Sequence, residues 1–220
     1  MKKFTPGRIG VLMGGVSTER EISLKSGKAV YAALKSCGED AEAIDIVEGT
    51  EEEVVRRLKE SRVKVAFLAL HGRFGEDGTI QSFLEKMQMP FTGSSQKASR
   101  LAMDKIASRR RFIEKGIAVP RHYNLNRADP YELKKIIRLF DGFPLVIKPS
   151  SHGSSIGITL AEDEVGVEKA IAVAFSYDEN IIIEEFIAGR ELTVGILEER
   201  PLPVVEIVPK EKFFDFSAKY

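Results

Sequence analysis

The chain has 220 residues, 43% of them hydrophobic and 30% charged, so it is long enough to bury one large core or two ordinary ones. Its 33 basic and 33 acidic residues cancel, which argues against a partner such as nucleic acid or an anionic membrane. The single cysteine excludes an internal disulfide, and no apolar run reaches the length of a signal-peptide core or a membrane span. We therefore expect a cytoplasmic protein.

The first part of the chain alternates apolar runs with helical patterns. In chain order the pattern predicts a strand at 8–13, a helix at 22–37, a strand at 41–46, a helix at 50–61 capped by Thr50, a strand at 63–70, a helix at 79–88 and a short strand at 90–93. Such alternation with short connections is typical of a parallel α/β sheet. Ligands of these sheets bind at the carboxyl ends of the strands.

After about residue 94 the pattern becomes α+β. It predicts a helix over 94–116 that is split near Asp104, strands at 121–125, 143–150, 155–161 and 180–187, helices at 130–139 and 163–176, and β-rich segments from residue 189 onward. Two strands are too few for an independent domain. The sequence therefore predicts an N-terminal domain over 1–93, a central domain over 94–188 and the beginning of a third domain over 189–220.

A loop made almost only of serine and glycine, SSHGSSIG at 151–158, joins two apolar β-type runs. It is either a flexible hairpin tip or a loop whose backbone amides hold an anion. Lys148 precedes it, and Gly153 and Gly157 allow the backbone to approach an anion closely, which favours the second reading. The Walker pattern is absent, and G-x-G-x-x-G does not follow the first strand, so the common nucleotide cradles are excluded.

Carboxylates follow the last strand of the central part. Glu184 and Glu185 end the run IIIEE, and Glu191 comes soon after. Each of them alone is more simply a solvated or ion-paired side chain. Acceptors at the end of a buried strand also suit an amino group and hydroxyl groups of a ligand.

The loops of the first sheet carry further candidates. His71 follows the strand at 63–70 in a glycine-rich loop, a position that favours function over packing. The structural alternative for the loop before the first helix is a cap by Ser17 or Thr18 with Glu21 completing a capping box, and this alternative leaves Glu19 without a structural role. By default, Lys105 and the arginine run at 109–111 are solvated helix charges. No serine or cysteine has the context of a catalytic nucleophile.

Together these segments resemble the D-alanine–D-alanine ligases of the ATP-grasp superfamily. The match runs through GRIGVLMGGVSTEREISLKSG, AFLALHGRFGEDGTIQSFLE, PFTGSS, MDK, VIKPSSHGSSIGI, IIIEEFIAGRELTVGI and FDFSAKY, and covers essentially the whole chain. The resemblance implies a parallel α/β domain, then an ATP-grasp α+β domain and the start of a C-terminal ATP-grasp domain. It also implies a homodimer that joins two D-alanines through an acyl phosphate, for peptidoglycan precursor synthesis.

The resemblance further implies a role for each candidate residue at the nucleotide. The serine-glycine loop, with Ser154 and Ser155, would close over the ATP phosphates. The remaining nucleotide contacts would be Lys105 and Lys148 to the phosphates, Glu184 to the adenine amine, Glu185 and Ile187 through their backbone to the adenine edge, and Glu191 to the ribose.

On the substrate side, the resemblance assigns the ammonium of the first D-alanine to Glu19 and its carboxylate to the neighbourhood of His71. Ser154 and Tyr220 would join Glu19 in a hydrogen-bond network that closes the site. Lys219 would contact the transferred phosphate. In the family, a tyrosine at the position of Tyr220 goes with a dipeptide product.

The family binds Mg²⁺ through residues that correspond to positions beyond Tyr220, so we expect no metal ligand within 1–220. Metal assistance is worth several kcal/mol, and we therefore expect residues 1–220 alone to be nearly inactive. The alternative is a non-catalytic nucleotide-binding module that keeps the ATP-grasp scaffold. A flavodoxin-like interaction domain is disfavoured, because it gives residues 94–220 no purpose.

Overall fold

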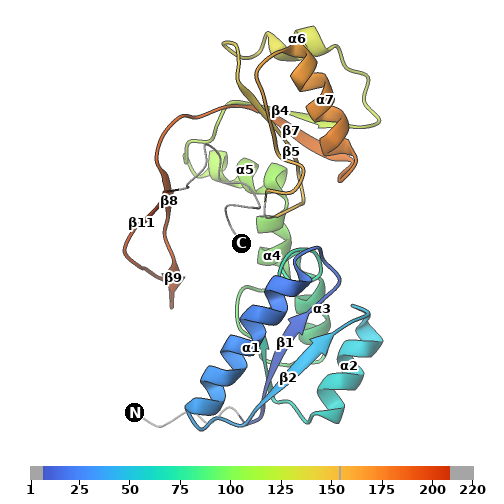
Figure 1. Cartoon of the computed structure of the whole chain (residues 1–220), viewed down its shortest axis with the longest axis vertical. Coiled ribbons are helices and arrows are strands. Elements are labelled where there is room, and N and C mark those ends of the chain that lie inside the picture. The colour runs from blue at the N-terminus through green and yellow to red at the C-terminus, as the bar shows by residue number, and fades with distance from the viewer. Residues whose placement is uncertain (1–6, 154, 209–220) are drawn as a thin grey trace. The chain divides into compact units, whose positions relative to one another are not determined.

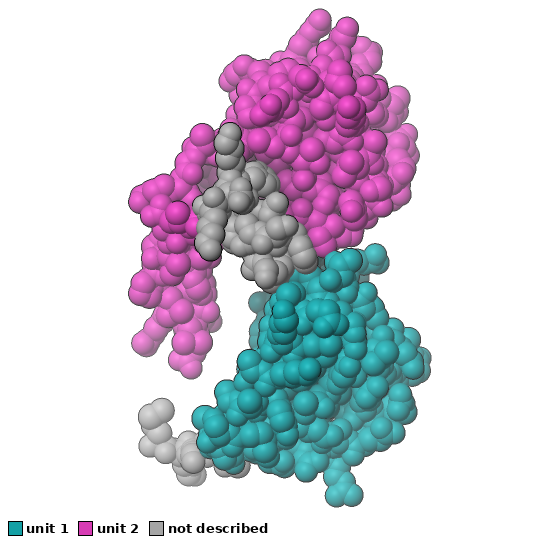
Figure 2. Space-filling model, in the orientation of Figure 1, with its two compact units in different colours: residues 1–108 teal, residues 109–220 magenta. Residues whose placement is uncertain are grey.

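A computed structural model describes residues 7–153 and 155–208 (Figure 1). The chain divides into two compact units, residues 1–108 and residues 109–220 (Figure 2). The three-part division with boundaries after residues 93 and 188 stays a prediction.

Unit 1 contains a three-stranded parallel sheet with the strand order β2-β1-β3. Its elements are β1 (Ile9–Gly14), α1 (Arg20–Ser36), β2 (Ala41–Ile46), α2 (Glu51–Glu60), β3 (Val65–Leu68), α3 (Thr79–Lys86) and α4 (Gln96–Met103). The predicted strand–helix alternation is confirmed. The third strand is shorter than predicted, and the strand expected at 90–93 is reduced to one parallel bridge between Phe91 and Ala66.

Apolar residues cover both faces of this sheet, as the continuous apolar character of its strands predicts. Leu12 and Ile46 pack with Val54 and Leu58 of α2 in one buried cluster. On the other face, Val11, Met13 and Ala69 pack with half-buried residues of α1. Apolar side chains therefore pack on both faces of the sheet.

Unit 2 is built on a four-stranded antiparallel sheet with the order β4-β7-β5-β6. Its elements are β4 (His122–Asn126), α6 (Leu133–Ile137), β5 (Leu145–Pro149), β6 (Thr159–Ala161), α7 (Glu164–Phe175) and β7 (Asn180–Glu185). The helix α5 (Lys105–Glu114) begins in unit 1 and continues into unit 2. The mixture of hairpin and crossover connections agrees with the predicted α+β pattern.

Strand alternation decides which side chains of this sheet reach the core. Leu145 and Ile147 of β5 lie in one buried cluster with Ile181 and Ile183 of β7, and this cluster includes the buried apolar residues of α7. The intervening residues, Val146, Lys148, Ile182 and Glu184, therefore belong to the opposite face. Two of the predicted nucleotide-binding side chains share that face.

The remaining strands form two short antiparallel ribbons, with β8 (Glu191–Thr193) beside β11 (Val205–Ile207) and β9 (Ile196–Leu197) beside β10 (Arg200–Pro201). The predicted break near Asp104 is confirmed, because α4 ends at Met103 and Asp104 has an extended backbone. Its Oδ1 atom accepts hydrogen bonds from the backbone of Ile106 and Ala107 and caps α5. No helix in the described part of the chain has the length and apolarity needed to cross a membrane.

Candidate functional site

Glu19 and His71 lie together at the carboxyl edge of the parallel sheet in unit 1. The Ser17 hydroxyl donates to the backbone oxygen of His71 at 2.8 Å and accepts from the backbone N–H of Glu19 at 3.1 Å. Gly72 has φ +67°, and a Cβ atom there would lie 2.5 Å from Oε2 of Glu19, so this position requires glycine. The buried Glu19 carboxylate thus lies directly against the loop that carries His71.

Polar groups contact both nitrogens of the His71 ring. Nε2 lies 3.1 Å from the Ser26 hydroxyl, and Nδ1 lies 3.7 Å from Oε1 of Glu76. The interaction with Glu76 raises the pKa of His71, and the charge of Glu19 adds to this against the opposing effect of burial. The arrangement therefore favours the imidazolium, a cation suited to a carboxylate ligand.

Ser23 ties the ends of two strands to α1. Its buried hydroxyl accepts from the backbone N–H of Gly14 at 2.8 Å and donates to the backbone oxygen of Ala69 at 2.7 Å. The structural alternative, a cap by Ser17 or Thr18, is wrong, since Glu19 occupies the N-cap position and makes no side-chain cap bond. Helical spacing gives α1 as a helix, but only the tertiary structure shows that Ser23 and Ser26 face the strand ends.

Lys148 and Glu184 form an ion pair on the face of the unit 2 sheet opposite the core cluster. The Nζ–Oε1 distance is 2.5 Å, and the two side chains are 15% and 7% exposed. The other oxygen of Glu184 pairs with Arg109. Arg109 was expected to be solvated with the rest of the run at 109–111, and this is wrong because it is buried, whereas Arg110 and Arg111 are exposed.

The serine-glycine loop connects β5 to β6, which pair antiparallel, so the hairpin reading is right about its connectivity. The backbone N–H of Ser151 donates to Oδ2 of Asp178 at 2.8 Å, and the His152 ring lies edge-on to Tyr177. Packing also explains Gly157, because a Cβ atom there would lie 2.8 Å from atoms of Pro149 and Tyr177. In this structure the amide of Ser151 is therefore engaged within the protein.

The remaining predicted nucleotide residues have different surroundings. Glu185 accepts from the backbone N–H of Arg121 at 2.8 Å, and this bond and the Arg121 guanidinium lower the pKa of Glu185. Ile187 is 61% exposed, and Glu191 is exposed on β8. Ser155 is half-buried with φ +61°, and Lys105 is the half-buried first residue of α5. Ser154, Lys219 and Tyr220 lie outside the described residues.

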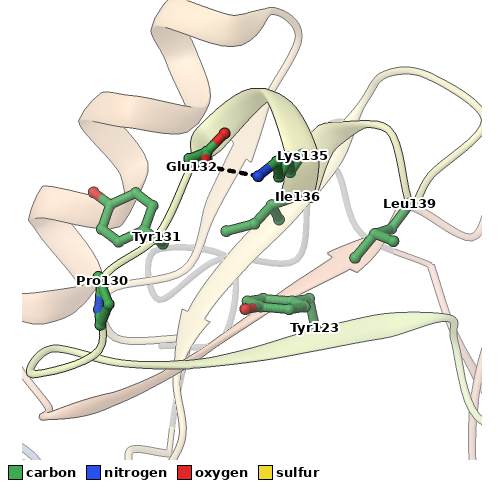
Figure 3. A pocket seen from close by; sticks show the side chains of 7 residues that line it. All are labelled: Tyr123, Pro130, Tyr131, Glu132, Lys135, Ile136 and Leu139. Carbon is green, nitrogen blue, oxygen red and sulfur yellow. Dashed lines mark hydrogen bonds and ion pairs between the residues drawn. The ribbon is translucent and has the colours of Figure 1, made fainter.

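A separate pocket of about 430 Å³ lies beside α6 (Figure 3). It is lined by Tyr123, Pro130, Tyr131, Glu132, Lys135, Ile136 and Leu139, and an ion pair of 2.7 Å joins Glu132 to Lys135. Tyr123 packs against the core cluster, on the face of the sheet opposite Glu184. No predicted site residue lines this pocket.

Two family models match the chain. The model described as D-ala D-ala ligase N-terminus covers residues 48–94, and the model described as D-ala D-ala ligase C-terminus covers residues 112–220. A D-alanine–D-alanine ligase of Syntrophotalea carbinolica is 44% identical over 97% of this chain and 67% of its own length. The chain belongs to the D-alanine–D-alanine ligase family.

Other relatives agree with this family membership. A D-alanine–D-alanine ligase of Geotalea uraniireducens is 47% identical over 97% of this chain and 66% of its own length. The solved structure of the Bacillus anthracis ligase complexed with ATP superposes with a TM-score of 0.81 at 33% identity, over 94% of this chain and 68% of that one. The chain thus spans about two thirds of these relatives, and the predicted ATP-grasp fold class is confirmed.

Proposed function

We propose that the protein carrying this chain is an ATP-dependent ligase that joins two D-alanine molecules for peptidoglycan precursor synthesis. The family membership supports this activity. The single structural observation that carries the proposal is the pairing of Lys148 with Glu184 on one face of the antiparallel sheet. The pair brings together a cation that can bind phosphate and a carboxylate that can accept from an amino group, and Lys148 lies on the strand that leads into the serine-glycine loop.

The proposed chemistry needs no nucleophile from the protein. The carboxylate of the first D-alanine takes the γ-phosphoryl group of ATP, which forms an acyl phosphate and releases ADP. The amine of the second D-alanine attacks the acyl carbon, phosphate leaves with the bonding electrons, and the amine loses a proton. Positioning and charge neutralisation are then the main contributions of the side chains.

The proposed substrate contacts fit the surroundings of two described residues. Glu19 is a buried carboxylate at a helix start, suited to an ammonium group, and His71 is a nearby imidazole whose raised pKa favours a cation that can pair with a carboxylate. The amino acid would then be bound at both charged ends. The roles of Ser154, Lys219 and Tyr220 stay proposals from the resemblance.

The proposed nucleotide contacts are Lys105, Lys148 and Ser155 for the phosphates and Glu184, Glu185, Ile187 and Glu191 for the nucleoside. We also propose Mg²⁺ as the companion ion of ATP. The described residues contain no group of three or more histidine, cysteine or acidic side chains that fits a metal ion. We therefore assign no step of the reaction to a metal held by these residues.

We further propose that the protein is a cytoplasmic homodimer. Its proposed use of ATP supports the location, and the resemblance to the family supports the dimer. Sedimentation equilibrium of the purified protein tests the dimer, since a single species with the mass of one chain contradicts it.

The function is tested by measuring ADP release and dipeptide formation by the full-length protein with ATP, Mg²⁺ and D-alanine. We expect ADP release that depends on D-alanine and produces one dipeptide per ADP. Glu19→Gln is expected to lower the rate at least a hundredfold, because it removes the charge that pairs with the ammonium. Glu21→Gln on the exposed side of the same helix is the control. ATP binding without any turnover supports the non-catalytic module instead.

A further inference from the structure

Arg109 is a buried cation that the sequence-based site did not include. It lies on α5, one helical turn after Lys105, and residues four apart share a face of a helix. Its side chain is 9% exposed and pairs with Oε2 of Glu184, while Lys148 pairs with Oε1. One carboxylate thus joins two cations, and this cluster carries a net charge of +1.

The Arg109 guanidinium also has donor capacity to spare. Its Nη1 atom is buried and has no hydrogen-bond partner among the described residues. A buried unsatisfied donor is costly, and such groups in native proteins call for a missing partner. The net positive charge and the spare donor together indicate a ligand with acceptor atoms at this position.

We propose that Arg109 is a positioning and selectivity residue for the purine base of the nucleotide. This inference rests on the proposed function, in which Glu184 accepts a hydrogen bond from the adenine amine. As the anion of two ion pairs, Glu184 only accepts hydrogen bonds, so it suits the 6-amino group of adenine and repels the 6-oxo group of hypoxanthine. Arg109 fixes this carboxylate, and its Nη1 donates to a ring nitrogen of the base.

The proposal is tested by measuring the dissociation constants of ATP and ITP for the wild-type protein and for Arg109→Gln. ITP differs from ATP by a 6-oxo group and the ring proton that accompanies it. We expect Arg109→Gln to raise the dissociation constant of ATP at least tenfold. We also expect the ratio of the ITP dissociation constant to the ATP dissociation constant to fall about tenfold. Because it keeps the charge, Arg109→Lys is expected to restore most of that ratio.

The same arginine run supplies matched controls, since Arg110 and Arg111 are exposed. Arg110→Gln and Arg111→Gln are expected to leave both dissociation constants unchanged. The selectivity role is overturned if Arg109→Gln raises the dissociation constants of ATP and ITP by the same factor, or if it changes neither. If the wild-type protein binds neither nucleotide, the proposed function itself fails, and this result is distinct from a failure of the Arg109 proposal.

A measurement on the wild-type protein covers the case in which Arg109→Gln does not fold. In NMR spectra of protein labelled with ¹⁵N-arginine, we expect ATP to shift the side-chain resonance of Arg109 and to slow the exchange of its N–H protons. We expect both effects to be smaller with ITP. Arg109→Lys assigns the resonance. An Arg109 resonance that is unchanged at saturating ATP overturns the proposal.

Discussion

The two units place their candidate site residues by different kinds of interaction. In unit 1, Glu19 and His71 are held in loops at the ends of parallel strands by hydroxyl–backbone hydrogen bonds. In unit 2, Lys148 and Glu184 lie on the two central strands of an antiparallel sheet and pair with each other, and Glu184 also pairs with the buried Arg109. In unit 1, hydrogen bonds from hydroxyl groups hold the backbone of the site in place. In unit 2, the sheet holds the backbone, and ion pairs hold the side chains.

This difference has a consequence for stability. Removing a hydroxyl from unit 1 leaves two backbone groups unsatisfied, which costs a few kcal/mol at most. Removing the carboxylate from unit 2 leaves two buried cations together, and an unpaired buried charge costs more. The losses of stability caused by substitutions in the two regions should therefore differ in magnitude and in how strongly they depend on charge.

The largest effect is expected for Glu184→Gln. The substitution leaves Lys148 and Arg109 without their shared anion at a site that is almost fully buried. We expect the free energy of unfolding to fall by about 3 kcal/mol, as measured by urea denaturation. Glu191→Gln, at an exposed position on β8, is the control and should leave the unfolding midpoint in place. An unchanged midpoint in Glu184→Gln would show that the ion pairs contribute no net stability.

A smaller effect is expected for Ser23→Ala in unit 1. It deprives the Gly14 N–H and the Ala69 carbonyl of their buried partner, and we expect a loss of about 2 kcal/mol. Ser36→Ala is a matched control, because Ser36 lies on the same helix and makes only an exposed bond within it. Equal losses in the two variants would contradict the role of Ser23 as a tie between strand ends.

The smallest effect concerns the titration of His71. Because its pKa is raised above 6.5, protonated His71 stabilises the folded state. This contribution is fully present at pH values below the unfolded pKa and is lost as the pH rises through the folded pKa. Glu76→Gln is expected to bring the pKa back toward its ordinary value, and Glu19→Gln should lower it by less. NMR titration of the ring protons measures both, and a larger shift in Glu19→Gln would reverse the assigned order of causes.

Local patterns were enough to predict most elements of both units, although β3 and α6 are shorter than predicted and the strand expected at 90–93 is a single bridge. The strand at 41–46 was predicted with the bounds it has, and Thr50 caps α2 as expected because its cap depends only on neighbouring residues. The break at Asp104 is likewise local. Arg109 was missed, because three consecutive arginines give no sign of which one faces a carboxylate 75 positions later.

The serine-glycine loop is a second case in which the local sequence predicted a feature but not its tertiary neighbours. Its glycines predicted a backbone that approaches something closely, and at Gly157 the close neighbours are Pro149 and Tyr177. Composition does not separate packing from anion binding, since both require a residue without a side chain. The loop is the part of the candidate site that most needs a direct measurement.

Amide hydrogen exchange of the β5–β6 loop, with and without ATP and Mg²⁺, is that measurement. If the loop closes over the phosphates, exchange at residues 152–157 slows at least tenfold on ATP binding. Residues 47–49, whose amides already donate to Glu53, provide an internal reference that should not change. Unchanged exchange at 152–157, with calorimetry showing the protein saturated with ATP, would contradict the account.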